Sequence, residues 1–232
     1  MKRLLILLTV LAMPAVAGAQ KYYSIEDSKW KISLGGGYSR RIAIFDKDSM
    51  DPVLYMHNKK LLGGFSGSAE VTYFTSQTGG FGLKFNEFRA SNDELVTVTY
   101  EDGSQKSGTM DETIDLFFIG PVGTFRKLST FGERAFIFSF GYGLVGERDN
   151  LLLIDDKYLM NGFTTGYLLE LGYDFTVSDH FAIGASLNAI AASLSSYNLT
   201  DDSGQTQTVK LDKDSYEGLM HVNFQIGIRY YL

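Results

Sequence analysis

The chain has 232 residues, of which 44% are hydrophobic and 14% aromatic, with 25 Gly, 3 Pro and no Cys. Its 21 Lys and Arg against 27 Asp and Glu give a formal net charge of −6. The length favours one domain, the lack of Cys excludes disulfides, thiolate metal sites and thiol catalysis, and the acidic balance argues against nucleic acid as a partner.

The first 20 residues, MKRLLILLTVLAMPAVAGAQ, have the three parts of a secretory signal peptide. The start is basic, an apolar run follows, and small residues end at Ala19. The apolar run is shorter than the roughly 20 residues that a membrane-spanning helix needs. We therefore expect cleavage between Ala19 and Gln20, so that residues 1–19 are the signal peptide and residues 20–29 form a short periplasmic segment.

From residue 30 onward, apolar and polar residues alternate with the period of two that a strand with unlike faces produces. The pattern predicts eight strands, at residues 30–41, 62–75, 80–90, 112–127, 135–146, 163–177, 181–195 and 220–232. The alternation in "LVTVTY" extends the third strand to about residue 100. Pro121 cannot donate a ladder hydrogen bond, so the fourth strand is expected to bulge or bend at Gly120–Pro121.

The connections between these strands alternate in length. "SQTGG", "KLSTFGER" and "VSDH" are short, whereas residues 42–60, 91–111, 147–161 and 197–217 make long polar loops. An even number of long alternating strands, rich in aromatics and glycines, is typical of outer-membrane barrels with short periplasmic turns and long extracellular loops. We predict an all-β fold, an antiparallel eight-stranded transmembrane β-barrel at residues 30–232 with up-and-down meander topology. A ten-stranded barrel stays open.

A soluble barrel of the lipocalin type is the structural alternative, because its apolar face points inward around a ligand. Periodicity alone does not say which face points outward. The polar face carries charged residues among many glycines, which suits a narrow lumen better than a solvated exterior. Aromatic residues also lie near strand ends, where the interfacial girdles of membrane barrels are found.

The last residues resemble a known assembly motif. Gln225-x-Gly227-x-x-Tyr230-x-Leu232 is similar to the C-terminal signal of Gram-negative outer-membrane barrels, although Leu replaces the usual terminal Phe. Residues 30–232 resemble the small porin-like outer-membrane β-barrel family of the Bacteroidota type. The resemblance implies location in the outer membrane and biogenesis by the barrel assembly machinery and periplasmic chaperones. It implies no catalytic residues.

The polar face supplies the candidate site. Eight strands leave an interior only just wide enough for side chains, and buried charges must be paired. We predict a salt-bridged plug without a wide aqueous channel, in which Lys31 and Arg41 lie near the ends of the first strand. Its central members are Glu70, Lys84, Asp115, Glu170, Asp174, His221 and Arg229.

Enzyme chemistry has weaker signals. "GYGLVG" lies within a strand, so it does not indicate a nucleotide site, and no metal-ligand spacing or cofactor motif is found. His57 and His180 fall in a predicted loop and turn, where a solvated surface is expected. His221 with Ser186, Ser193 or Ser195 and a carboxylate is the alternative, a lipid A-modifying enzyme.

The sequence thus predicts a monomeric barrel with a structural or binding role, or a narrow passage for small solutes. A channel for small hydrophobic solutes with a lateral opening near Gly120–Pro121 is a further alternative. Outer-membrane lipid and lipopolysaccharide are the expected surroundings. The long loops are acidic, and divalent cations that bridge them to lipopolysaccharide, or a binding surface for an external partner, are alternatives to the favoured interpretation of solvated loops. Solvation alone also explains this loop charge.

Overall fold

The computed structural model describes residues 24–43, 50–99 and 103–232. The predicted signal peptide and its cleavage site at Ala19–Gln20 lie outside these residues. The described elements, in chain order, are β1 (Trp30–Arg41), α2 (Pro52–Lys60), β2 (Gly63–Phe74), β3 (Gly79–Thr99), β4 (Gln105–Leu128), β5 (Arg134–Leu153), β6 (Asp156–Thr176), β7 (Phe181–Leu194), β8 (Ser196–Thr200), β9 (Thr206–Lys210), η2 (Lys213–Ser215), β10 (Glu217–Gly218) and β11 (His221–Tyr231).

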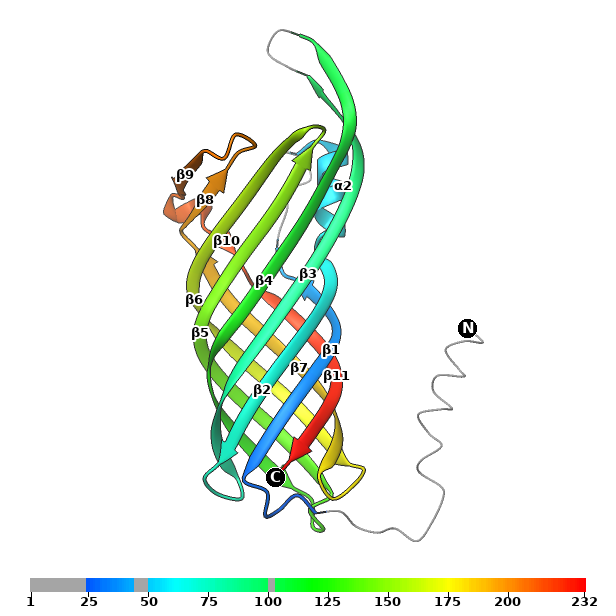
Figure 1. Cartoon of the computed structure of the whole chain (residues 1–232), viewed down its shortest axis with the longest axis vertical. Helices are drawn as coiled ribbons and strands as arrows, with labels where there is room; N and C mark the ends of the chain where they lie inside the picture. The colour runs from blue at the N-terminus through cyan, green and yellow to red at the C-terminus, as the bar shows by residue number, and fades with distance from the viewer. Residues whose placement is uncertain (1–23, 44–49, 100–102) are drawn as a thin grey trace, which may run out of the picture.

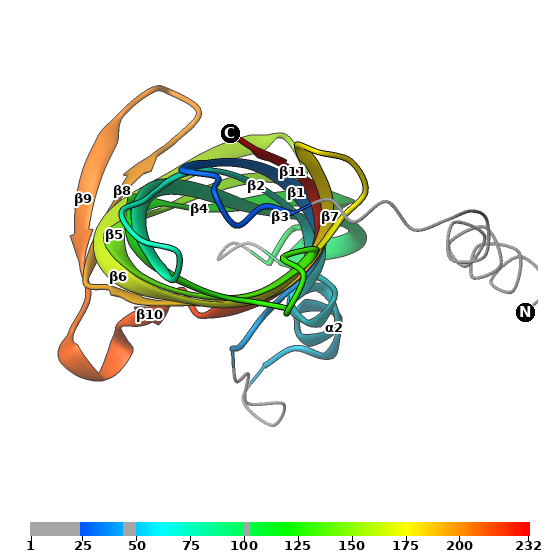
Figure 2. The ribbon, with the colours of Figure 1, turned by 90° about the horizontal axis from the view of Figure 1, so that it is seen from below.

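Eight of the strands form a closed antiparallel ring. Each of β1 to β6 pairs with the next strand in sequence, β6 pairs with β7, β7 with β11, and β11 closes the ring on β1. Figure 2 shows the ring from below, and Figure 1 shows it from the side. The predicted eight-stranded meander is confirmed, since β8, β9 and β10 lie outside this ring of eight.

β3 ends at Thr99, as the alternation in "LVTVTY" predicted, whereas β4, β5 and β6 are longer than predicted. β3 and β4 stay paired from Gly79↔Phe125 to Thr99↔Gln105, and β5 and β6 from Arg134↔Phe175 to Leu153↔Asp156. The predicted loops at 91–111 and 147–161 are therefore wrong for most of their length. The two hairpins instead rise above the ring at its upper end (Figure 1).

Two other predicted loops also contain regular structure. Residues 42–60 include α2, which Asp51 caps by accepting hydrogen bonds from the amides of Val53 and Leu54, with Pro52 in the first turn. Residues 197–217 contain most of the β8–β9 hairpin, which pairs with the upper part of β6. The short turns predicted at the lower end are confirmed.

The strand containing Pro121 does not bulge. The β4–β5 pairing is interrupted at Gly120–Pro121, but it resumes in the same register on both sides, at Ile119↔Leu144 and Val122↔Gly141. On the other side, Leu83 and Lys84 of β3 pair with Pro121 and Gly120. The missing amide therefore leaves a local gap in the ladder without opening the wall of the barrel.

The outer face of the ring carries a continuous apolar band. On β5, for example, Phe136, Phe138 and Phe140 are exposed while the alternate residues face the lumen. Aromatic contacts mark the lower edge of the band at Trp30–Tyr73, with ring centroids 4.9 Å apart. Such exposure on every side of a protein is typical of a surface that lipid covers.

Charged residues limit the height of the band, as on β3, where Phe85 is followed on the outer face by Glu87 and Arg89. The upper parts of the hairpins thus extend beyond it. Among the described residues, none belongs to a helix with the length and hydropathy of a membrane span.

Closure of the ring depends on close backbone contact between β1 and β11. A Cβ added at Gly227 would collide with the carbonyl oxygen of Leu34 and the Cα of Gly35, whereas a Cβ at Gly67 on β2 would meet nothing within 4 Å. We predict that Gly227→Ala lowers the free energy of unfolding by about 2 kcal/mol or more, while Gly67→Ala changes it little. Urea unfolding of the barrel in lipid, followed by the fluorescence of Trp30, measures both. Equal stability of the two variants would contradict this account of closure.

Candidate functional site

The centre of the lumen is filled by alternating charges. Lys84 on β3 contacts two carboxylates, with its Nζ 3.0 Å from Oε2 of Glu70 and also in contact with Glu170 on β6. Lys31 on β1 contacts the other oxygen of Glu70 at 2.9 Å. All four side chains are at most 5% exposed. The contact between Lys84 and Glu170 crosses the lumen, because β3 and β6 are not neighbours in the ring.

Amide side chains complete the middle of the lumen. Asn188 on β7 donates to Glu170 and to Oε1 of Gln225, both at 3.5 Å. Gln225 on β11 donates to Oγ of Ser66 at 3.0 Å. Asn223 donates across the lumen to Oδ1 of Asn86 on β3 at 3.3 Å. Neutral hydrogen bonds therefore continue the charged cluster toward the strands that close the ring.

The lower end of the lumen is closed by Arg126 of β4. Its guanidinium donates to the carbonyl oxygens of Gln77, Ile25, Glu26 and Ser28 at 2.7 to 3.2 Å. The segment before β1 is thereby held across the opening.

A second polar cluster is formed by side chains of β6 and β11. Asp174 on β6 accepts a hydrogen bond from the hydroxyl of Tyr231 at 2.6 Å and contacts Nε of Arg229 at 3.4 Å.

The upper part of the interior is apolar. The cluster is formed by buried side chains from β3 to β7 and from the two segments around α2 and β10, namely Leu61, Phe88, Ala90, Ile114, Leu116, Phe118, Val122, Val145, Leu168, Ile190, Leu194 and Leu219. His221 borders this cluster, with its ring centroid 5.8 Å from that of Phe88. The interior is thus partly a core like that of a soluble protein, which alternation did not predict.

The structure places six of the seven central residues of the predicted plug inside the barrel. Glu70, Lys84 and Glu170 form one cluster, Asp174 and Arg229 form a second, and the buried His221 belongs to neither. The prediction for Asp115 is wrong. It shares the outer face of β4 with Phe117 and Ile119 and contacts the exposed Arg89, with Nε and Oδ1 3.5 Å apart.

His221 has no catalytic neighbour of the predicted kind. Its Nδ1 hydrogen-bonds to the carbonyl oxygen of Leu219 at 3.0 Å, and its Nε2 has no partner among the described residues. Ser186 lies opposite Gln225 on the adjacent strand, and Ser193 lies on the outer face. No Ser–His pair is therefore formed by these residues.

A cavity opens at the upper mouth of the barrel, between the end of β1, the segment after α2, and β10. Its volume is about 550 Å³. The carboxylates of Glu112 on β4, Asp149 on β5 and Glu217 on β10 line it, together with the guanidinium of Arg41 and apolar side chains that include Leu61 and Ile114. Arg41 reaches across the ring to Glu147, 3.5 Å away, and also contacts Glu217 at 3.3 Å. We call Glu112, Glu147, Asp149, Glu217 and Arg41 the mouth cluster.

The mouth cluster contains four carboxyl groups and one guanidinium. Burial, followed by repulsion from Glu112 and Glu217, raises the pKa of Asp149 to about 7. Burial and the neighbouring Glu217 raise the pKa of Glu147 to about 8, and burial raises that of Glu112. Asp149 and Glu147 therefore exchange protons near neutral pH.

His57 was expected on a solvated surface, and that prediction is wrong. It is fully buried in α2, and burial lowers its pKa, so that it is neutral at pH 7. Its Nδ1 is 2.8 Å from Nδ2 of Asn92, which donates, so Nε2 carries the proton toward Oε2 of Glu112, 2.9 Å away. His57 thus fixes α2 to β3 and orients one carboxylate of the mouth cluster.

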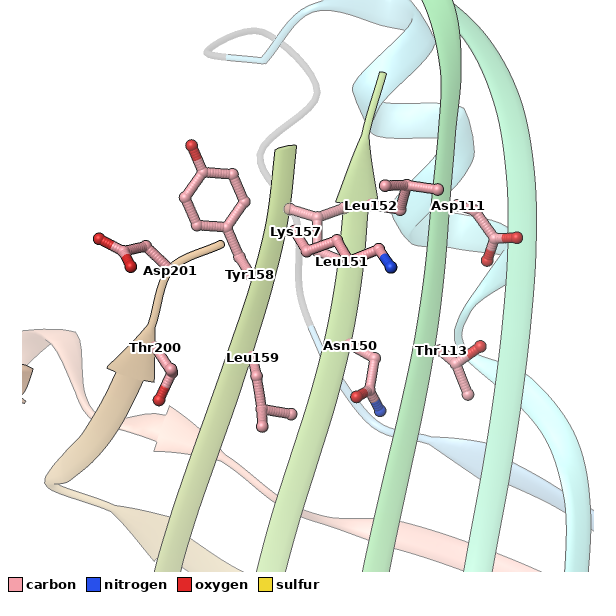
Figure 3. Close-up of a pocket in the computed structure, with 10 residues that line it drawn as sticks. All are labelled: Asp111, Thr113, Asn150, Leu151, Leu152, Lys157, Tyr158, Leu159, Thr200 and Asp201. Carbon is pink, nitrogen blue, oxygen red and sulfur yellow. The ribbon is translucent and has the colours of Figure 1, made fainter. Parts of the chain in front are cut away.

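A second hollow of about 470 Å³ lies on the outer face of the upper hairpins, against the end of β8. Figure 3 shows Leu152, Leu159 and Tyr158 with Asp111 and Asp201 around it. The carboxylate of Asp201 already accepts hydrogen bonds from Ser203 and from the amide of Gln205. The residues around this second hollow lie at the protein surface, whereas several of those in the mouth cluster are buried. Among the residues that the structure describes, no group of His, Cys, Asp or Glu has an arrangement that could hold a metal ion.

The central cluster gives a direct test of the buried charges. We predict that Lys84→Met lowers the free energy of unfolding by about 3–5 kcal/mol, because it leaves Glu70 and Glu170 buried with less compensation. Adding Glu170→Gln should recover part of this loss. Lys60→Met, which removes an exposed partner of Glu94, should cost about 1 kcal/mol or less. Urea unfolding in lipid measures all three, and equal losses at Lys84 and Lys60 would contradict the role of the cluster.

The raised pKa values predict that the mouth is less stable at higher pH. The folded state keeps protons that the unfolded chain has lost above its ordinary carboxyl pKa of about 4. Stability is therefore lost as the pH rises from about 4 to about 8. Hydrogen–deuterium exchange of amides in the upper parts of β4 and β5 should speed up over this range beyond the intrinsic change. Asp149→Asn should weaken the pH dependence, and Asp155→Asn at the exposed hairpin tip should not.

Comparison with known proteins agrees with this geometry. No family model matches the chain, and no curated protein matches its sequence. A major outer membrane protein of Thermus thermophilus is similar in structure, with a TM-score of 0.53 at 12% identity, covering 89% of this chain and 100% of the other.

The outer membrane protein OprG of Pseudomonas aeruginosa gives 0.52 at 12% identity, covering 90% of this chain and 99% of the other. Neisserial surface protein A gives 0.50 at 10%, covering 88% and 97%. The chain thus has the fold of small outer-membrane β-barrels of Gram-negative bacteria.

Proposed function

We propose that the protein is a closed barrel in the outer membrane of a Gram-negative bacterium, where it has a structural or binding role and forms no open channel. The apolar band would lie in lipid. The hairpins and the mouth cavity at the upper end would face the exterior, and the short turns would face the periplasm. In this proposal the barrel is exported with a cleaved signal peptide, assembled through its C-terminal strand, and works as a monomer surrounded by lipid and lipopolysaccharide.

The observation that carries this proposal is that side chains cross the lumen at several levels. Arg126 closes the lower end, Lys84 joins Glu170 in the middle, and the apolar cluster fills the interior above them. Higher still, Arg41 reaches Glu147 on the opposite strand. An eight-stranded barrel has little interior beyond what side chains occupy. These contacts support a filled lumen over a passage for solutes.

A lipid-modifying enzyme in the same barrel finds less support. That activity needs a nucleophile and a base within hydrogen-bond reach of each other. The carbonyl of Leu219 and the ring of Phe88 surround His221 instead, and it faces the lumen rather than the lipid. The lateral-opening alternative is also weakened, because the strands on either side of Gly120–Pro121 stay paired in register.

Planar-bilayer recording tests the proposal. The purified barrel should give no steady conductance, whereas a 16-stranded porin in the same bilayer should give clear steps, because its lumen contains an aqueous channel. Orientation can be checked in cells by labelling a Cys introduced at the exposed Asp155 with a reagent that does not cross membranes. Steady nanosiemens-scale conductance of the barrel would show an open lumen and overturn the proposal.

A further inference from the structure

The mouth cavity has features of a ligand site that the closed lumen does not explain. We propose that it binds a small organic cation, a protonated amine attached to an apolar body. This inference deepens the binding role proposed above. It does not depend on the absence of conductance, because the cavity lies above the contacts of Lys84 and above the apolar cluster.

The charge of the mouth cluster favours a cation. Carboxylates reach it from three elements, Glu112 from β4, Glu147 and Asp149 from β5, and Glu217 from β10. Arg41 is the one cation that the structure shows in contact with them, through Glu147 and Glu217. The guanidinium contacts Glu147 and Glu217, so Glu112 and Asp149 are in contact with no cation among the described residues, and a bound ammonium group would supply one.

Unpartnered polar atoms in the cluster are a second, independent observation. Glu147 is 1% exposed, and its Oε2 has no hydrogen-bond partner among the described residues. Oδ1 of Asp149 is likewise buried without a partner there. Arg41 lines the cavity and is 8% exposed, and its Nε is also buried without a hydrogen-bond partner among the described residues. Buried groups of this kind are rarely left unpaired. A ligand with an ammonium donor and one acceptor would satisfy Oδ1 of Asp149 and Nε of Arg41, the two of these residues that line the cavity.

The shape and walls of the cavity favour an organic ligand over a bare metal ion. Its volume of about 550 Å³ is within the usual range of small-molecule sites. Leu61, Ile114 and Tyr216 line it beside the carboxylates. The described carboxylates do not form an arrangement that could hold a metal. The apolar body of an amine would contact these walls while its ammonium group meets the carboxylates.

Tyramine is a suitable probe, because it joins an ammonium group to an aromatic ring with a hydroxyl acceptor. We expect isothermal titration calorimetry of the full barrel in lipid nanodiscs to show saturable binding of tyramine. Neutral 4-ethylphenol, which keeps the ring and lacks the amine, should bind at least tenfold more weakly. Calcium chloride, titrated separately, should neither bind saturably at the mouth nor displace tyramine stoichiometrically.

Variants locate the binding at the mouth. Asp149→Asn should weaken tyramine binding about tenfold to a hundredfold through loss of one charge-assisted hydrogen bond. Asp93→Asn, at an exposed position on the outer face of β3, is the matched control and should leave binding unchanged. If Asp149→Asn fails to fold by circular dichroism, Glu217→Gln on the short β10 replaces it with the same expectation.

The pH dependence gives a further readout. The groups that face Asp149 are Glu112, Glu147, Glu217 and Arg41, with neutral His57 behind Glu112. Binding should tighten from pH 5 to pH 8 as Asp149 and Glu147 lose protons. It should also release protons, which titrations in buffers of different ionisation enthalpy detect. Equal binding of tyramine and 4-ethylphenol, calcium binding in place of tyramine, or no effect of the mouth variants would overturn the inference. None of these results would alter the conductance test.

Discussion

The structure depends on the narrowness of an eight-stranded ring. Such an interior cannot hold a column of water wide enough to solvate charges, so every charged side chain that points inward must find a partner there. Lys84 meets this constraint by contacting Glu70 and Glu170 at once. Because these partners lie on β2 and β6, one ammonium group fixes the distance between opposite walls.

Above this cluster the interior changes character. Phe88, Leu116 and Phe118 pack there as they would in a soluble protein. The carboxylates of Glu112 and Asp149 lie on the far side of this apolar layer from Glu70 and Glu170. Glu112 contacts His57 of α2, and Asp149 lies beside Glu112 on the neighbouring upper hairpin. A barrel with short strands would lack both the upper hairpins and α2. Lengthening the central strands thus creates a site without altering the ring.

Period-two alternation made the ring of eight strands and most of its inward residues predictable from the sequence. Asp115 was misplaced because residues 116–119 are apolar on both faces, so the pattern does not fix which face is inward there. The hairpin extension through Glu147 and Asp149 looked like a loop, because both faces are polar where neither meets lipid. The helix α2 was missed, although Asp51 followed by Pro52 is a signal for the start of a helix. The contacts of Lys84 across the lumen depend on strand tilt, which local sequence does not encode.

Arg126 also bears on the order in which the barrel closes. Its partners Ile25 and Ser28 are 101 and 98 residues away in sequence, and contacts that close such long loops form late because chain entropy opposes them. All its acceptors are backbone carbonyls, which are present whatever the side chains of that segment. We therefore expect the contacts of Arg126 to form only after β1 to β4 are in place, and to slow the unfolding of the closed barrel more than they speed its folding.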